Sequence, residues 1–197
     1  MAMRIGLDLR LATPADLDLL RRWDEQPHVI AARTSDDWGW EAELRRLPDW
    51  REQLIAEIDG RAIGFVQIID PRREDSHYWG EVAEDLRAID IWIGDETDLG
   101  KGYGTTMMEL ALARCFGSPA VSAVLVDPLA ANVRVRLFYE RLGFRFVERR
   151  YFGEDECFVY RLDRADYRAA QQHAEPAPPK AALLDTGAAS RRGARLA

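Results

Sequence analysis

The sequence predicts an α/β domain with a mixed sheet, and three observations point to this fold class. Several short runs alternate between apolar and polar residues, which is the period of a half-buried strand. Asp59-Gly60 and Gly153-Glu154 each separate two such runs, and this placement predicts two antiparallel hairpins. Two further strand-like runs are each followed by a helical pattern, which is typical of strand–helix units. The expected sheet is therefore mixed, mostly antiparallel and flanked by helices.

The first half of the chain begins with an alternating strand and a capped helix. Thr13 can accept hydrogen bonds from first-turn amides, and Pro14 suits the first helical position. Pro48 ends a second helical segment, because proline removes a backbone donor. The predicted elements are a strand over 5–11, a helix from 13, a helix over 35–47, and strands over 51–58 and 62–69.

The second half continues with the strand–helix units and the closing hairpin. Ile89, Ile91 and Ile93 share one face of a strand, as their spacing of two requires. Gly143 follows the last predicted helix, where glycine accepts the left-handed backbone that ends many helices. The predicted elements are strands over 87–94, 120–126, 144–151 and 156–162, a helix from the glycine-rich segment to about 116, and a helix over 132–142.

The chain of 197 residues predicts one domain over 1–168 and a low-complexity, disordered tail over 169–197. The tail is rich in Ala, Pro, Gly and Arg and has little apolar content. The chain carries neither a signal-peptide pattern nor an apolar window long enough to span a membrane, so we expect a cytoplasmic protein.

Charge and residue types exclude several functions. The net charge of −7 argues against nucleic acid and anionic membranes as partners, and it permits a cationic partner. Cys115 and Cys157 stand in apolar contexts, so we expect two buried free thiols. The three histidines show no spacing to either cysteine or to one another that indicates a metal site or a Cys–His pair, and no nucleophile elbow is present. We therefore expect no metal and no covalent nucleophile.

A glycine-rich segment between a strand and a helix is the first candidate site. Gly100, Gly102 and Gly104 let the backbone approach an anion closely, and the following helix presents its N-terminus. Lys101 can add positive charge. The spacing matches neither the Walker loop nor the dinucleotide fingerprint. The pattern predicts a site for a phosphate or pyrophosphate.

A second candidate pair lies on the next helix. Asn132 and Tyr139 are seven residues apart, so two helical turns bring them to one side. An amide that can bind a ligand and a phenol that can give a proton then share a face. A pair of this kind, taken alone, is more often a helix cap and a core residue.

Together these segments resemble the GNAT N-acetyltransferases. The resemblance rests on Leu99-Gly-Lys-Gly-Tyr-Gly104, on Asp127-Pro128, and on Asn132 through Tyr139-Glu-Arg-Leu-Gly-Phe144. It implies the GNAT acyl-CoA N-acyltransferase fold and acetyl-CoA as co-substrate. The family usually has Gln or Arg where this chain has Leu99, which removes a side-chain contact and keeps the amide groups. The implied cofactor-binding residues are Ile91, Trp92, Ile93, Leu99, Gly100, Lys101, Gly102, Tyr103, Gly104, Thr105, Asp127 and Asn132.

Within that superfamily the chain is most similar to the aminoglycoside 6'-N-acetyltransferases, over about 9–167. Arg87-Ala-Ile-Asp90 followed by Leu99 to Thr105 is the most telling stretch. The resemblance ties Asp90 to the reacting amine. The expected reaction is direct attack of the amine on the thioester. Asp90 then takes or relays the amine proton, or holds the cation in place, and Tyr139 protonates the leaving thiolate.

The segment 70–98 fits a polycationic acceptor. It holds ten acidic residues against three basic ones, and aromatic residues lie within and before it. Aromatic faces beside carboxylates suit a sugar that carries ammonium groups. The alternative interpretation is a solvated acidic loop with aromatic packing. The predicted substrate-binding residues are Trp38, Tyr78, Trp79, Glu81, Glu84 and Asp85.

Two other functions remain open at this stage. One is a GNAT acyltransferase with a different acceptor: a siderophore hydroxylamine, a polyamine or a protein N-terminus. The other is a non-catalytic acyl-CoA-binding module, against which the presence of Asp90 and Tyr139 argues. The chain could be a monomer or a homodimer, because the closing hairpin could pair with a second copy.

Overall fold

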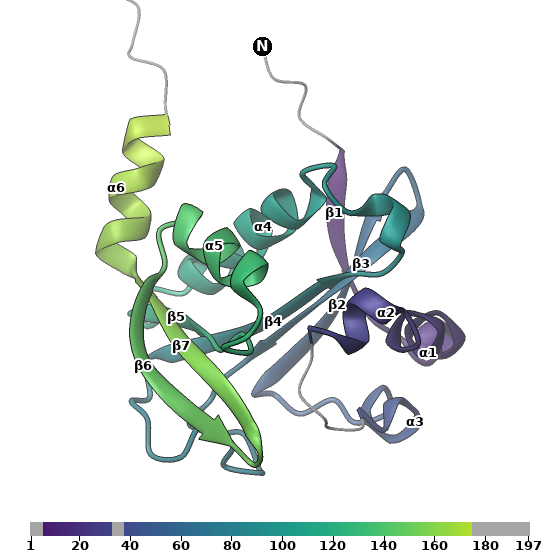
Figure 1. Cartoon of the computed structure of the whole chain (residues 1–197), viewed down its shortest axis with the longest axis horizontal. Helices are drawn as coiled ribbons and strands as arrows, with labels where there is room; N and C mark the ends of the chain where they lie inside the picture. The colour runs from purple at the N-terminus through teal and green to yellow at the C-terminus, as the bar shows by residue number, and fades with distance from the viewer. Residues whose placement is uncertain (1–5, 33–37, 175–197) are drawn as a thin grey trace, which may run out of the picture.

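The computed structural model describes residues 6–32 and 38–174, which form a seven-stranded sheet covered by helices on both faces (Figure 1). The strand order is β1-β2-β3-β4-β5-β7-β6, and only β4 and β5 pair in parallel. The strands are β1 Leu7–Leu11, β2 Arg51–Ile58, β3 Arg61–Ile69, β4 Leu86–Ile93, β5 Ala123–Val126, β6 Arg145–Phe152 and β7 Asp155–Asp163. The helices are α1 Leu17–Asp24, α2 Pro27–Ile30, α3 Trp40–Glu43, α4 Tyr103–Gly117, α5 Val133–Arg141 and α6 Arg164–Ala174.

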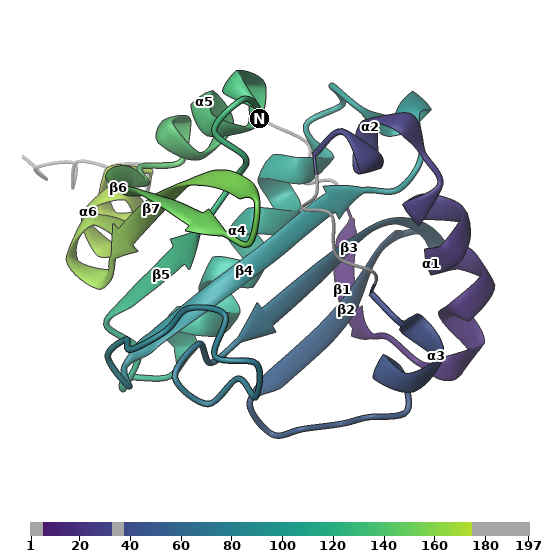
Figure 2. The same ribbon diagram turned by 60° about the horizontal axis from the view of Figure 1, so that its bottom comes forward.

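The predicted fold class is confirmed, because the sheet is mixed and its pairs are antiparallel except for one. Helix α4 covers one face, where Met107, Met108 and Ala111 join the largest apolar cluster. Helices α1 and α3 cover the other face over β2 and β3, where Trp23 and Trp40 belong to a second cluster (Figure 2). Successive side chains along a strand point to opposite faces of the sheet, so each strand contributes to the clusters on both faces.

The strands β4 and β5 separate part of the way along their length. They pair only where Leu86–Ala88 lies beside Ala123–Leu125. From there β4 runs on to Ile93 with β3 as its neighbour, while Val126 at the end of β5 pairs with β7. Splitting two parallel strands leaves backbone groups of β4 without a strand partner on that side. This notch is the feature that positions the candidate site.

One glycine in β4's continuation is required by packing. A Cβ built on Gly94 would lie 1.9 Å from Cε2 of Trp23, whose side chain is fully buried. The backbone after β4 therefore passes directly against the indole of α1. This contact fixes how α1 crosses the sheet.

Two differences from the predicted elements concern helices. The predicted helix over 35–47 is far shorter, because within the described part only α3, Trp40–Glu43, is helical, and its predicted start lies outside the described residues. The short helix α2 was not predicted, since four residues carry no helical period. Strand β5 is also shorter than predicted and starts at Ala123.

A further difference lies at the domain boundary. Helix α6 runs to Ala174, past the predicted end of the domain at residue 168. Tyr167 stacks on Phe116 with ring centroids 4.6 Å apart, and Arg164 donates from Nε to the carbonyl oxygen of Val121 at 2.6 Å. These contacts attach α6 to the end of α4, so the polar composition of the segment did not reveal its packing. The rest of the predicted tail lies outside the described residues.

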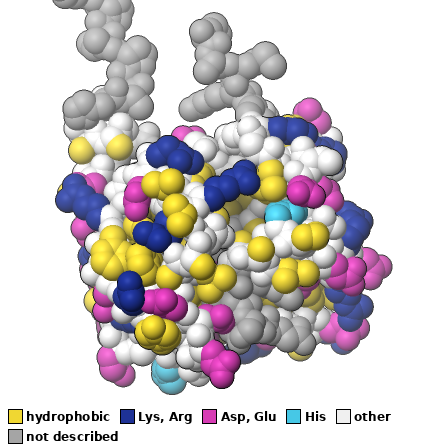
Figure 3. Space-filling view, in the orientation of Figure 1, with side chains coloured by type: hydrophobic (Ala, Val, Ile, Leu, Met, Phe, Trp, Pro, Cys, Tyr) yellow, Lys and Arg dark blue, Asp and Glu magenta, His cyan; other side chains and the backbone are white. Residues whose placement is uncertain are grey.

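Strand β6 is an edge of the sheet and is largely exposed. Phe146, Val147 and Tyr151 present apolar side chains on it, and Figure 3 shows hydrophobic side chains gathered on this side of the molecule. In residues 6–32 and 38–174, no helix is long and apolar enough to cross a membrane.

Candidate functional site

The site is centred on a row of polar side chains that crosses the sheet. Gln53 on β2 is the register partner of Gln67 on β3, and Gln67 is the register partner of Asp90 on β4. Gln53 donates from Nε2 to Oε1 of Gln67 at 3.1 Å, and Gln67 donates from Nε2 to Oδ2 of Asp90 at 3.0 Å. The two glutamines are only 8% and 6% exposed. The row lies on the face opposite α4, beside the notch between β4 and β5.

Asp127 lies at the other side of this notch. The parallel register pairs Ala88 with Leu125, and continuing it by two residues brings Asp127 abreast of Asp90. The hydroxyl of Tyr78 donates to Oδ2 of Asp127 at 2.7 Å. The predicted role of Asp127 in cofactor binding stays a prediction. A carboxylate paired with Asp90 would repel a diphosphate, and it suits a cation.

The two carboxyl groups perturb each other. Burial raises the pKa of Asp90, and the hydrogen bond from Gln67 opposes this rise. Burial, followed by the charge of Asp90, raises the pKa of Asp127 to about 8, while the Tyr78 hydroxyl acts in the opposite direction. Two half-buried carboxylates that lie close together do not both ionise readily, so the pair retains a proton near neutral pH unless a cation enters.

Tyr139 faces the same pair from α5. It is 5% exposed and belongs to the apolar cluster under α4, with Phe144 in edge contact at 5.6 Å. Burial raises the pKa of Tyr139, and the charges of Asp90 and Asp127 raise it further. The phenol therefore holds its proton across the physiological range. It is suited to giving a proton to a strong base and unsuited to acting as a base itself.

The glycine-rich segment forms an open backbone cradle at the N-terminus of α4. Gly100 and Gly102 have φ of +76° and +85°, and a Cβ on either would meet nothing within 4 Å. Within the described residues, the amides of 100 to 104 have no hydrogen-bond acceptor. Helix α4 is 15 residues long, so its N-terminus adds a positive dipole to these amides. The segment can hold a diphosphate.

Asp98 connects this cradle to strand β3. It is 2% exposed and accepts hydrogen bonds from Arg61 Nη1 at 2.6 Å and Lys101 Nζ at 2.8 Å. The guanidinium of Arg61 and the ammonium of Lys101 lower the pKa of Asp98, although burial opposes them. Lys101, expected to add charge for an anion, is thus tied to Asp98. Lys101 therefore helps to hold the cradle in place through its bond to Asp98.

Four other residues of the motif also have internal contacts. Asn132 accepts a hydrogen bond at Oδ1 from the amide of Val135 at 3.2 Å, so it caps α5. Leu99 and Tyr103 pack against the cluster under α4. Thr105 donates its amide to the Gly102 carbonyl oxygen at 3.1 Å. The alternative of a helix cap, left open for Asn132, is the observed arrangement.

Ile91, Trp92 and Ile93 lie on β4 beyond the part that pairs with β5. Ring nitrogen Nε2 of His28 is 2.9 Å from the carbonyl oxygen of Ile93, so α2 reaches this stretch of strand. The Trp92 side chain points to the face opposite α4, where its ring lies 4.5 Å from Phe65. His28 was missed by sequence reasoning because no motif or periodicity marks a single residue on a short helix.

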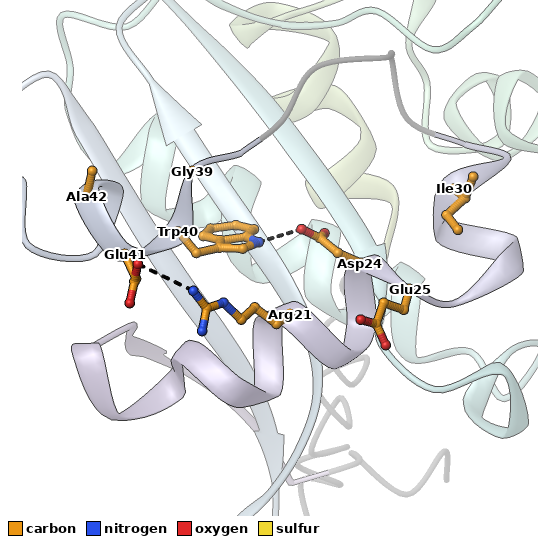
Figure 4. Close-up of a pocket in the computed structure, with 8 residues that line it drawn as sticks. All are labelled: Arg21, Asp24, Glu25, Ile30, Gly39, Trp40, Glu41 and Ala42. Carbon is orange, nitrogen blue, oxygen red and sulfur yellow. Dashed lines mark hydrogen bonds and ion pairs between the residues drawn. The ribbon is translucent and has the colours of Figure 1, made fainter.

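An aromatic cluster borders Asp90 on that face. Trp38 stacks on Trp40 at 5.0 Å between ring centroids and lies 5.3 Å from Trp92. Trp40 is buried and donates to Asp24 at 2.6 Å, and Arg21 forms an ion pair with Glu41, as Figure 4 shows around the hollow between α1, α2 and α3. Trp38 is half-buried, so part of its ring is accessible.

The loop before β4 brings a second aromatic group. Tyr78 stacks on Phe152 of β6 with ring centroids 4.0 Å apart, and its hydroxyl reaches Asp127. Trp79 is only 3% exposed and packs in the core beside Phe152. Its ring has no accessible face here, and the predicted contact of Trp79 with a substrate stays a prediction. It supports Tyr78.

The remaining acidic residues of this segment lie at the surface. Glu81 is exposed and forms an ion pair with Arg72, and Glu84 is exposed. Asp85 is half-buried, and its carbonyl oxygen accepts the amide of Ser122. These residues can attract a cation at a distance, and no contact with the Asp90 row is observed for them.

Gln53 and Gln67 were not identified from the sequence. Each stands at an inward position of a strand whose other residues on that face are apolar: Ile55 on β2, and Phe65 and Ile69 on β3. A polar amide at a core position of a strand was the available signal, because buried amides require partners.

Comparison with known proteins agrees with this geometry. The model of the acetyltransferase (GNAT) domain family matches residues 12–152. Aminoglycoside N(6')-acetyltransferase type 1 of Klebsiella pneumoniae is 29% identical over 153 residues, which is 71% of this chain and 74% of that protein. Lysine N-acyltransferase MbtK of Mycobacterium tuberculosis is 24% identical over 153 residues, covering 71% and 69%.

Solved structures share the fold. The crystal structure of aminoglycoside acetyltransferase AAC(6')-Ib in complex with coenzyme A and kanamycin has a TM-score of 0.73 at 23% identity, covering 84% of this chain and 99% of that chain. The family match spans the polar row, the glycine-rich cradle and Tyr139. The chain therefore belongs to the acetyltransferase (GNAT) domain family and is an N-acetyltransferase of that family.

Proposed function

We propose that the enzyme transfers an acetyl group from acetyl-CoA to the 6'-amino group of an aminoglycoside by direct attack in a ternary complex. One observation carries the proposal. A pair of half-buried carboxyl groups, Asp90 and Asp127, lies close enough to the phenol of Tyr139 to raise its pKa, at a notch in the sheet. This arrangement offers acceptors for an ammonium and a proton donor for a leaving group close to one another.

The backbone cradle supports acetyl-CoA as the co-substrate. Amides 100 to 104 and the N-terminus of α4 would hold its diphosphate, and coenzyme A supplies the thioester. Amides of β4 around Ile91 and Ile93, beyond the part paired with β5, would bind the pantetheine arm and steady the thioester oxygen. Asn132 would contribute indirectly. Its hydrogen bond with the amide of Val135 caps α5, and α5 carries Tyr139.

The carboxyl pair supports an amine as the acceptor. An ammonium that enters between Asp90 and Asp127 would displace their shared proton and satisfy both charges. An ammonium is no nucleophile, so it must then lose a proton. The raised pKa of Asp90 makes it a better base for this step than an exposed aspartate. The amine then attacks the carbonyl carbon, and the carbon–sulfur bond breaks.

Tyr139 would complete the reaction at the sulfur. Its pKa is raised, so it carries a proton when the thiolate leaves and can transfer that proton from its hydroxyl group. Burial is the largest cause of this raised pKa, and the charges of the carboxyl pair raise it further. The same pair thus binds the amine and keeps the acid protonated.

Aromatic and acidic groups around the notch support a polycationic sugar as the acceptor. The accessible part of Trp38 and the ring of Tyr78 would flank the sugar, and Glu81, Glu84 and Asp85 would attract its other ammonium groups from the surface. The likeness to a 6'-acetyltransferase, over 71% of this chain, supports the same acceptor class.

A lysine-type amine is the second candidate acceptor. It is favoured by the likeness to lysine N-acyltransferase MbtK, which covers 71% of this chain. A single aliphatic amine would also fit between the two carboxyl groups. It would not use the acidic surface around Glu81 and Glu84.

Release of free thiol from acetyl-CoA in the presence of an amine panel tests the proposal. We expect turnover with kanamycin-class aminoglycosides that carry a 6'-amine, and none with analogues that carry a 6'-hydroxyl. Turnover should weaken with added salt, because a polycation is bound by charge. Turnover of only lysine-type amines supports the second candidate. Coenzyme A binding without turnover of any amine would refute both.

A further inference from the structure

The Gln53–Gln67–Asp90 row interrupts an apolar face and has a defined hydrogen-bond direction. Ile55 and Phe65 lie on one side of it in the cluster under α1 and α3, and Ile69 and Ala88 lie on the other side in the cluster around Trp79. A buried amide costs free energy unless both its ends are paired. Two buried glutamines between two apolar clusters therefore indicate a role other than packing.

The direction of the row follows from its two bonds. Gln53 donates to the carbonyl oxygen of Gln67, so the amide nitrogen of Gln67 faces Asp90. If Gln67 turned over, its carbonyl oxygen would face a carboxylate and its amide nitrogen would face the Gln53 nitrogen. Both contacts would be repulsive. Gln53 thus selects which end of Gln67 meets Asp90.

We propose that Gln67 is a positioning residue for acetyl transfer and that Gln53 fixes its orientation, so that Oδ2 of Asp90 is held in the sheet while Oδ1 is presented to the acceptor amine. This inference rests on the proposed function of Asp90. It adds two residues, on strands β2 and β3, to the machinery that controls the reacting carboxylate.

The groups around Asp90 show why such a donor matters. Asp127, Tyr78 and Tyr139 face Asp90 from the end of β5, the preceding loop and α5, and none of them carries positive charge. Among the described residues, Gln67 is the side chain that donates a hydrogen bond to Asp90. A donated bond favours the charged form, which Asp90 needs in order to take a proton.

Carboxyl ¹³C NMR of the full-length protein tests this without requiring turnover. The signal of Asp90 is assigned by its loss in Asp90→Asn, and its titration is compared between wild type and Gln67→Met, an isosteric variant without an amide. We expect the midpoint to rise by about one pH unit in Gln67→Met, because a hydrogen bond to a charged group is lost. An unchanged midpoint would overturn the proposal.

Two further variants separate positioning from folding. Gln53→Met leaves Gln67 free to turn, so its shift should lie between wild type and Gln67→Met. The double variant Gln53→Met/Gln67→Met removes both amides and leaves none without a partner, so it should fold. Its Asp90 titration midpoint should rise as much as in Gln67→Met. Gln172→Met on the exposed surface of α6 is the control and should show no shift.

Kinetics then connect the row to the reaction. The acidic limb of kcat/KM should move to higher pH by the same amount in Gln67→Met, with about a tenfold loss of rate on that limb. In an Asp90→Asn background, Gln67→Met should cost nothing further, because it acts through Asp90. An additive loss there would overturn the positioning role. Absence of amine acetylation by the wild type would refute the proposed function. An Asp90 titration midpoint that does not change in Gln67→Met would refute only the positioning role of Gln67 and Gln53.

Discussion

The hydroxyl of Tyr78 donates to Oδ2 of Asp127 at 2.7 Å and so connects the loop before β4 to the end of β5, 49 residues later in the chain. Tyr78 also stacks on Phe152, so one ring joins the loop, the carboxyl pair and the closing hairpin. The contact directs one oxygen of Asp127 and opposes the rise of its pKa.

Tyr78→Phe should therefore weaken amine binding more than it slows chemistry. The ring would keep its stack on Phe152, while Asp127 loses a donor and protonates more readily. We expect KM for the amine to rise by about three- to tenfold with kcat within about twofold. Initial-rate kinetics with a saturating acetyl donor measure this. A fall in kcat at constant KM would contradict the assigned role.

Tyr139→Phe should lower kcat by about two orders of magnitude or more, because general acid catalysis contributes on that scale. The KM values of both substrates should change little, since the buried ring keeps its packing against Phe144. Steady-state kinetics separate the two parameters. Phe138→Leu, a half-buried neighbour on α5, is the matched control and should retain most of the rate.

Asp127→Asn should stabilise the free protein at alkaline pH and have little effect at acid pH. The folded-state pKa of Asp127 is raised, so the folded state holds a proton that the unfolded state has already lost. Wild-type stability therefore falls as pH rises from the ordinary aspartate pKa to the raised one, and stays low above it. Asparagine has no such proton. Urea unfolding at pH 5 and pH 9 tests this, and a larger benefit at pH 5 would contradict the sign.

Asp98→Asn should raise KM for acetyl-CoA and leave kcat nearly unchanged. Asp98 is the common acceptor for Arg61 and Lys101, and an amide cannot neutralise both. The cradle should loosen, and coenzyme A affinity should fall by about tenfold. Isothermal titration with coenzyme A measures it directly. Glu96→Gln, on the exposed side of the same turn, should show no effect.

Gly94→Ala should destabilise the fold by several kcal/mol, since the added methyl would overlap the buried indole of Trp23. Thermal unfolding should reveal a large drop in melting temperature. Gly6→Ala is a matched control, because a Cβ there meets nothing within 4 Å. Equal melting temperatures for the two variants would show that α1 can shift freely.

Local patterns in the sequence were sufficient for most of the sheet. Alternation and the Asp59-Gly60 turn predicted β2 and β3 to within one residue, because a half-buried strand and a tight turn carry their own periodicity and composition. The helix over 35–47 was predicted too long, and helix α6, which continues past residue 168, was not predicted. Their lengths depend on contacts such as Tyr167 with Phe116 that composition does not record.

The motifs determined the family, and they named the glycine-rich cradle, Asp90 and Tyr139 as candidates for the site. Asp127 was found by the same motif, but the sequence did not reveal that it lies beside Asp90. Its side of the notch is set by the parallel register of β4 and β5, a relation between segments that are far apart in the chain.

The sequence by itself determined the strands, the hairpins and the chemical groups, because each depends on neighbours within a few residues. Only the tertiary structure decided that Gln53, Gln67 and Asp90 form one line across three strands with Asp127 beside it after β5, and that Trp79 is core while Tyr78 reaches Asp127. The physical reason is that register and strand separation are fixed by packing on both faces of the sheet. A shift of one residue in any strand would turn its member of the line to the other face.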